Sequence, residues 1–182
     1  LPPVSGIAGG VKRGQLQMLR LFNVVGAVVA LGAAFVFAAA PASAQVLDGS
    51  SPEEVVAMME AYGLNVEIEY PEDSEGPVLN SASDSFMFQV TFEACDADGE
   101  GCELIVFRSG FGFEPGDQPD LETLNQWNSE VWGKAYMDES GNPWIALEVN
   151  LVGGITEDNM MDTLTWWDGM MIEFADHIGY EY

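Results

Sequence analysis

The sequence predicts an α+β fold in two layers, an antiparallel sheet with helices packed on one face, and three stretches carry this prediction. Residues 86–92 alternate apolar and polar side chains, which is the period of a half-buried strand. Residues 134–151 form two apolar runs around a polar turn, as in a β-hairpin. Residues 156–178 carry an apolar stripe at helical spacing, and hairpins with helices on one side build such a layered domain.

The first half of the predicted domain contains one helix and four strands. The helix begins at Ser51, which is expected to cap it in a capping box with Glu54, and it ends at Gly63. Strands are predicted over residues 66–70, 78–82, 86–92 and 104–107. We expect residues 78–82 at an edge of the sheet. Residues 104–107 are apolar on both faces and belong in its centre.

The second half contains two helices and a hairpin. Asp120 is placed to cap a helix that stops at Gly133. Residues 134–138 and 144–151 form the strands of the hairpin. Thr156 caps the last helix. The apolar stripe of that helix is formed by Met160, Leu164, Trp167, Met171, Phe174 and Ile178.

Four aromatic residues of the central stretch allow two interpretations. Trp127, Trp132, Tyr136 and Trp144 either pack in the core and at the edge of the sheet, or form an aromatic patch that binds a partner. Trp166 lies off the stripe of the last helix, where it either widens the packed seam or contributes to an interface.

The amino-terminal residues indicate export. Arg20 precedes the uncharged apolar segment 21–40, and the small residues 42–44 form an A-x-A cleavage site. We expect residues 18–44 to be a signal peptide and residues 1–17 to lie upstream of the true start at Met18. A membrane anchor is the competing interpretation, because twenty apolar residues can span a bilayer. The small residues and the cleavage site favour removal, which would leave residues 45–182 as one domain without a stable anchor.

The charge of this domain excludes one class of ligand. All 30 acidic residues follow position 44, where Arg108 and Lys134 are the only Lys or Arg residues, so the net charge there is −28. Such a body repels phosphates, which excludes nucleic acid and anionic membranes as ligands. A soluble surface adapted to salt is the simplest interpretation, and cations or basic protein segments are the favoured partners.

Few residues are candidates for chemistry. Cys95 and Cys102 flank a short acidic turn between two strands, and an exported protein is expected to join them in a disulfide. Asp96, Asp98, Glu100 and Gly101 resemble the opening of a calcium loop, but the twelfth position is the apolar Phe107. His177 is the only histidine, so no zinc site and no Ser-His-Asp set are predicted. We expect no metal, cofactor or catalytic residue.

Residues 113–174 resemble the carboxyl half of the YbjN-type bacterial domains. The resemblance rests on an N-x-W-N helix end, a K-A-Y strand, an acidic turn and a G-G-x-T helix start, here Asn125, Trp127, Asn128, Lys134, Ala135, Tyr136, Asp138, Gly153, Gly154 and Thr156. Cys95, Cys102 and the R-S-G-F of residues 108–111 are similar to the amino half, so the resemblance covers residues 51–178. It implies a fold like that of the type III secretion chaperones and a role in sensory transduction regulation. It implies no catalytic residues.

We therefore expect a periplasmic or secreted, chaperone-like or regulatory module that binds a protein or peptide, and that pairs as a homodimer. The candidate binding or family-motif residues are Trp127, Asn128, Trp132, Lys134, Tyr136 and Trp144. Two alternatives stay open: a hydrolase that uses paired carboxylates, and a surface protein that depends on calcium or another cation.

Overall fold

The computed structural model describes residues 46–72, 74, 76–83, 86–97 and 101–182. The predictions for residues 1–17 and 18–44 lie outside this part of the chain. The helices are α1 (Pro52–Tyr62), α2 (Leu121–Glu130) and α3 (Glu157–His177). The strands are β1 (Val46–Leu47), β2 (Val66–Glu69), β3 (Val78–Ala82), β4 (Met87–Glu93), β5 (Leu104–Gly110), β6 (Lys134–Met137), β7 (Pro143–Asn150) and β8 (Ile155–Thr156).

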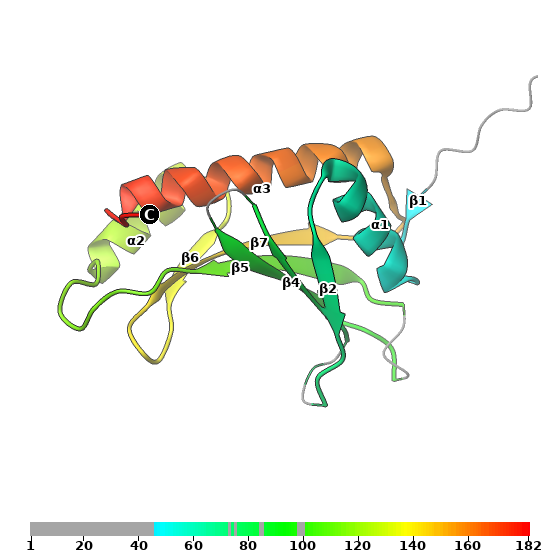
Figure 1. Cartoon of the computed structure of the whole chain (residues 1–182), viewed down its shortest axis with the longest axis horizontal. Coiled ribbons are helices and arrows are strands. Elements are labelled where there is room, and N and C mark those ends of the chain that lie inside the picture. Colours follow the sequence, from blue (N-terminus) through cyan, green and yellow to red (C-terminus); the bar gives the residue numbers. More distant parts are fainter. Residues whose placement is uncertain (1–45, 73, 75, 84–85, 98–100) are drawn as a thin grey trace, which may run out of the picture. The chain divides into compact units, whose positions relative to one another are not determined.

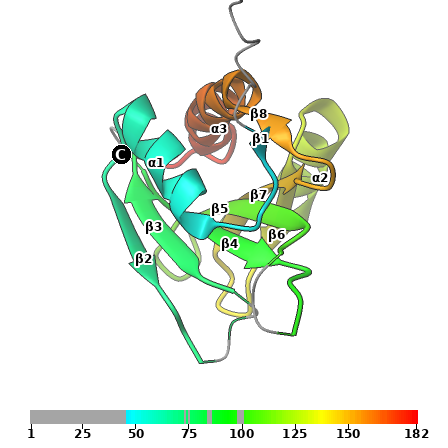
Figure 2. The same ribbon diagram turned by 90° about the vertical axis from the view of Figure 1, so that its right-hand side faces the viewer.

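Six of the strands form one antiparallel sheet in the order β2-β3-β4-β5-β7-β6. Neighbouring strands are consecutive in the chain, except that α2 and the edge strand β6 intervene between β5 and β7. The three described helices all lie on one face of the sheet, and none of them covers the other face (Figure 1; Figure 2). The predicted α+β architecture is confirmed.

The strand register explains which side chains face the helices. Phe107 of β5 pairs with Val90 of β4 and with Leu147 of β7, so these three side chains point to the same face. Val90 and Phe107 are fully buried. The predictions of a strand around residues 86–92 and of a central strand at residues 104–107 are confirmed.

Helix α3 packs its apolar stripe against this face of the sheet. Each of the six predicted stripe residues is at most 7% exposed. The ring centroid of Trp167 lies 5.6 Å from that of Phe107 and 6.1 Å from that of Phe88. The helix starts as predicted, because the hydroxyl of Thr156 accepts a 3.2 Å hydrogen bond from the N–H of Asn159.

Helix α1 begins and ends where the sequence predicts, but its capping box is absent. The Ser51 hydroxyl donates to the carboxylate of Glu53 at 3.0 Å and makes no side-chain cap. The prediction of a box with Glu54 is therefore wrong, because the acidic residue two positions on takes the hydroxyl instead. Pro52 still fits the first turn, since it has no N–H to satisfy. Gly63 ends the helix with φ of 105°.

Helix α2 has the predicted start and an earlier end. Asp120 accepts a 2.9 Å hydrogen bond from the N–H of Thr123, as expected of a cap. The helix ends at Glu130, because Val131 is already extended, and so it stops before Gly133. Gly133 has φ of 97°, and a Cβ there would lie 2.7 Å from the sulfur of Met170. This glycine turns the chain closely past α3 into β6.

Two features of the sheet differ from the prediction. Strand β3 lies between β2 and β4, so the expectation that residues 78–82 form an edge is wrong. Val78 and Leu79 point to opposite faces and are both buried, which is typical of an internal strand. The two-residue strands β1 and β8 form a small second sheet that the sequence did not reveal. Among the described residues, no helix combines the length and the apolar character that a membrane crossing requires.

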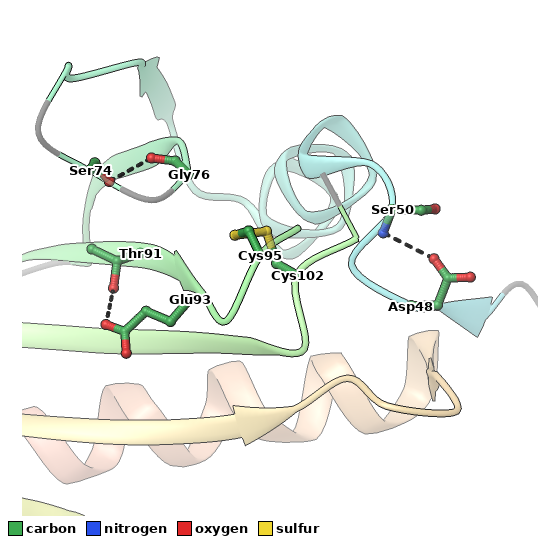
Figure 3. The surroundings of a disulfide bond; sticks show 8 residues. All are labelled: Asp48, Ser50, Ser74, Gly76, Thr91, Glu93, Cys95 and Cys102. Carbon is green, nitrogen blue, oxygen red and sulfur yellow. Dashed lines mark hydrogen bonds between the residues drawn. A yellow bond between two sulfur atoms is a disulfide. The ribbon is translucent and has the colours of Figure 1, made fainter. Parts of the chain in front are cut away.

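The hairpin of β4 and β5 carries a disulfide at its end (Figure 3). Cys95 and Cys102 are seven residues apart, and their sulfurs are 2.09 Å apart. The N–H of Cys102 donates to the carbonyl of Gly49 at 3.2 Å. A Cβ on Gly49 would lie 2.0 Å from the Cys102 carbonyl oxygen, so only glycine fits this approach. The hairpin end thus anchors the segment that precedes α1.

Replacing both cysteines, Cys95→Ser with Cys102→Ser, is expected to lower the free energy of unfolding by about 2–3 kcal/mol. The disulfide closes a short loop, so it removes only a modest part of the entropy of the unfolded chain. Urea denaturation of the oxidised protein and of the double variant measures the difference. The protein in excess reductant should match the double variant, and equal stability of all three samples would contradict a stabilising bridge.

Candidate functional site

The six candidate residues of the sequence lie in three different places. Trp127 and Asn128 belong to α2 and serve the fold. Trp132 lies between α2 and β6, next to α3. Lys134, Tyr136 and Trp144 lie on the face of the sheet that the helices leave free.

Trp127 is a core residue, in agreement with the packing interpretation of the aromatic residues. Only 2% of it is exposed. Its ring centroid lies 5.0 Å from that of Phe174 and 5.5 Å from that of His177. The Nε2 atom of His177 is 2.8 Å from the carbonyl oxygen of Thr123, which ties the end of α3 to the start of α2. The single histidine is therefore engaged between two helices.

Asn128 covers an edge of the sheet. Its Oδ1 accepts a 2.7 Å hydrogen bond from the N–H of Ala135, and its Nδ2 donates to the carbonyl of Ala135 at 3.0 Å. These are the backbone groups of β6 that an added strand would need. The side chain takes the place of a neighbouring strand at this position, so the edge is closed to another chain here.

The free face of the sheet, called the open sheet face below, brings together residues from four strands. Two rows of paired residues run across β5, β7 and β6. The first row consists of Arg108, Ala146 and Lys134, and the second of Gly110, Trp144 and Tyr136. The residues that point outward on this face include Met87, Gln89, Thr91, Glu93, Arg108, Gly110, Lys134, Tyr136 and Trp144.

The two basic residues after position 44, Arg108 and Lys134, both lie on this face. The guanidinium of Arg108 forms an ion pair with the carboxylate of Glu93 at 2.5 Å and also contacts the hydroxyl of Thr91. The Nζ atom of Lys134 lies 5.7 Å from the centroid of the Tyr136 ring, within the range of a cation–π contact. Lys134 is exposed, so its charge is available to a ligand.

Trp144 is fixed against the sheet by its neighbours. Its ring lies over Gly110, where a Cβ would be 2.5 Å from the nearest ring atom. Its indole N–H donates to the carboxylate of Asp138 at 3.0 Å, and its ring is stacked with Tyr136 at 6.4 Å. A cavity of about 210 Å³ lies beside Trp144, and it is smaller than the pockets of about 300–1,000 Å³ that enclose a small molecule. It is lined by Asn80, Met87, Phe88, Gln89, Arg108, Gly110 and Trp144.

Two ionisable groups of this region have shifted pKa values. The N–H groups of Asn142 and Trp144 hold the pKa of Asp138 below its ordinary value of 3.8. Burial raises the pKa of Tyr136 above its ordinary value of 10.0, although the positive charge of Arg108 acts in the opposite direction. The carboxylate is therefore charged and the phenol neutral near pH 7, and the site presents hydrogen-bonding and ionic groups suited to binding.

Metal ligands do not gather in the described part of the chain. No group of three His, Cys, Asp or Glu side chains lies there in an arrangement that could hold a metal ion. Asp98 and Glu100 of the acidic turn lie outside the described residues.

Two contacts of the candidate residues and their surroundings were not predicted from the sequence. The contact of Arg108 with Glu93 and Thr91 depends on the register of β4 and β5, although the alternation of β4 already indicated that its polar side chains share one face. Trp132 meets Trp166 of α3, with ring centroids 6.1 Å apart. No local pattern links these two tryptophans.

Trp127→Ala and Trp132→Ala are expected to differ strongly in their effect on folding. Loss of the buried Trp127 ring should lower the free energy of unfolding by about 3–5 kcal/mol, because it leaves a cavity. Trp132 is 76% exposed, and its loss should change that energy by about 0.5 kcal/mol at most. Chemical denaturation followed by circular dichroism measures both. Equal losses would contradict the division between core and surface.

Asp138→Asn is expected to lower stability at pH 7 and to matter less in acid. Since the folded pKa of Asp138 is depressed, its contribution is present above the unfolded value of 3.8 and is lost as pH falls through the folded pKa. The urea midpoint of the unmodified protein should therefore exceed that of the variant at pH 7, and this difference should shrink below pH 3.8. Asp117→Asn in the exposed loop before α2 is the control. A difference that is the same at pH 7 and pH 3 would contradict the role of the charge.

A comparison with protein families identifies the relatives of this chain. The family model YbjN, described as "Putative bacterial sensory transduction regulator", matches residues 51–179. No curated protein matches the sequence. The match includes every strand of the large sheet and all three helices. Because it spans more than half of the chain, as the resemblance in its motifs implied, the protein belongs to the YbjN family.

Proposed function

We propose that the protein is an exported regulatory module that binds a protein partner through the open sheet face and carries out no catalysis. The observation that carries this proposal is the placement of Arg108 and Lys134. A domain with a net charge of −28 has both of its Lys and Arg residues on one helix-free face, beside two stacked aromatic rings. The description of the family as a sensory transduction regulator supports a regulatory role.

The exposed side chains of the open sheet face are not needed for the core. Met87 is 80% exposed, although it belongs to the internal strand β4, where it pairs with Ala82 of β3. Large apolar side chains that stay exposed in a patch with charged neighbours are typical of interaction surfaces. Aromatic residues and arginine are also enriched where proteins meet. These properties favour a protein as the ligand.

The edges of the sheet support binding by side chains rather than by strand addition. Asn128 occupies the backbone groups of Ala135 in the edge strand β6. The other edge strand, β2, carries the exposed acidic residues Glu67 and Glu69, which discourage pairing with another strand. A partner therefore has better access to the broad face than to either edge.

Export is supported by the signal-peptide pattern of residues 18–44 and by the pairing of Cys95 with Cys102. Disulfides persist outside the reducing cytoplasm. A periplasmic or secreted regulator would sense or hold another exported protein, and a shape like that of the type III secretion chaperones suits this task.

Site-specific photo-crosslinking in cells that express the full chain tests the proposal. A photoreactive amino acid at Met87 should give one discrete adduct with a partner, and the same amino acid at Leu121 should not. Leu121 is a matched control, because it is 64% exposed but belongs to α2 on the helix side. Lys134→Glu should weaken the Met87 adduct without changing the thermal midpoint, because the Lys134 side chain is exposed. Equal adducts from both positions, or none from Met87, would exclude the open sheet face as the binding surface.

A further inference from the structure

A second exposed aromatic cluster lies away from the open sheet face. Trp132, between α2 and β6, is 76% exposed, and Trp166 of α3 is 52% exposed. Their ring centroids are 6.1 Å apart and the ring planes meet at 86°. Two large rings from distant parts of the chain thus contact each other while both stay open to solvent. The core does not require this, since neither ring is buried.

The two tryptophans border a cavity of about 260 Å³. Its lining, called the tryptophan pocket below, consists of Val131, Trp132, Thr165, Trp166, Gly169, Met170 and Glu173. The α3 members Thr165, Trp166, Gly169, Met170 and Glu173 follow helical spacing and share one side of the helix. A site of this size is smaller than the pockets that enclose a whole small-molecule ligand, and it suits one side chain.

Gly169 keeps this pocket open. It lies in the interior of a 21-residue helix, where glycine costs about 1 kcal/mol relative to alanine. A Cβ at this position would meet no atom within 4 Å, so packing does not require a glycine there. Any larger side chain would instead occupy the space between Trp166 and Glu173. The missing side chain therefore creates room for a group from outside the molecule.

The charges around the pocket select a cation. Its lining contains the carboxylate of Glu173 and no Lys or Arg. Asp162, one helical turn before Trp166, adds a second exposed acidic side chain on α3. The faces of tryptophan rings attract ammonium and guanidinium groups, and the net charge of −28 steers basic ligands toward the protein.

We propose that the tryptophan pocket binds the lysine or arginine side chain of a basic peptide segment. The aliphatic stem packs against Trp132 and Met170, and the cationic end lies near the ring of Trp166 and the carboxylate of Glu173. This inference is independent of the proposed function, because none of these residues belongs to the open sheet face. A second copy of the chain is a poor occupant, since it would bring another 28 excess negative charges to Glu173.

The test measures binding of two capped tripeptides to the protein purified from cells that express the full chain. One peptide is Gly-Lys-Gly, and the other has norleucine in place of lysine and so keeps the stem without the charge. Indole N–H signals in NMR titrations report the occupancy. Lysine should bind at least about ten-fold more tightly than norleucine, and added salt should weaken only the lysine peptide.

Matched variants assign the binding to the pocket. Trp132→Ala should weaken the lysine peptide about five- to thirty-fold, and Glu173→Gln about three- to ten-fold. Gly169→Leu should abolish binding while raising the thermal midpoint, because it fills the pocket and improves the helix. Ile172→Ala is the control, since Ile172 is 41% exposed on the same helix but does not line the pocket. It should leave the affinity unchanged, as should Lys134→Glu on the open sheet face.

Three results would overturn this inference. Equal affinity for the lysine and norleucine peptides would show an apolar groove without selection for charge. Self-association that Trp132→Ala or Gly169→Leu removes, measured by sedimentation, would show that a second copy occupies the pocket. Absence of binding by either peptide would show that the pocket does not capture a basic side chain. None of these results bears on the adduct expected from Met87, so the two proposals fail separately.

Discussion

The structure depends on the contact between the apolar stripe of α3 and the core face of the sheet. One side chain, Trp167, lies 5.6 Å from Phe107 of β5 and 6.1 Å from Phe88 of β4, and so joins the helix to two central strands. Burial of a large apolar side chain contributes about 1.5–3 kcal/mol, and six such residues outweigh the cost of Gly169 within the helix. This contact also decides which face of the sheet is covered and which remains free for ligands.

The sequence predicts the parts of the fold that follow from local periodicity. The stripe of α3, the alternation of β4, and the caps at Asp120 and Thr156 all involve residues a few positions apart, and each has the predicted structure. The position of β3 does not follow from such a pattern. Its five residues are buried on both faces at one end only, although β2, the strand before it in the chain, pairs with its outer side.

The candidate site shows the same limit more sharply. Trp127 and Trp132 are five residues apart and looked equivalent in the sequence, yet one is 2% and the other 76% exposed. The difference arises because α2 ends at Glu130, so Trp132 no longer follows the helix that buries Trp127. Its neighbour Trp166 comes from α3, and their contact depends on how the two helices pack. Residue type left core packing and an aromatic patch both open, and only the packing separates these residues into core and surface.

Electrostatics separates the two surfaces that this packing leaves free. Arg108 and Lys134 flank Ala146 across neighbouring strands, so their backbones are two strand spacings, about 10 Å, apart. Both side chains lie on the open sheet face, where Glu93 pairs with Arg108 and the exposed Lys134 is left to meet a carboxylate of a partner. The tryptophan pocket has the opposite preference, because Glu173 stands beside two rings that attract cations. One partner with charges of both signs, or two partners of opposite charge, can thus occupy the two surfaces without competing for the same residues.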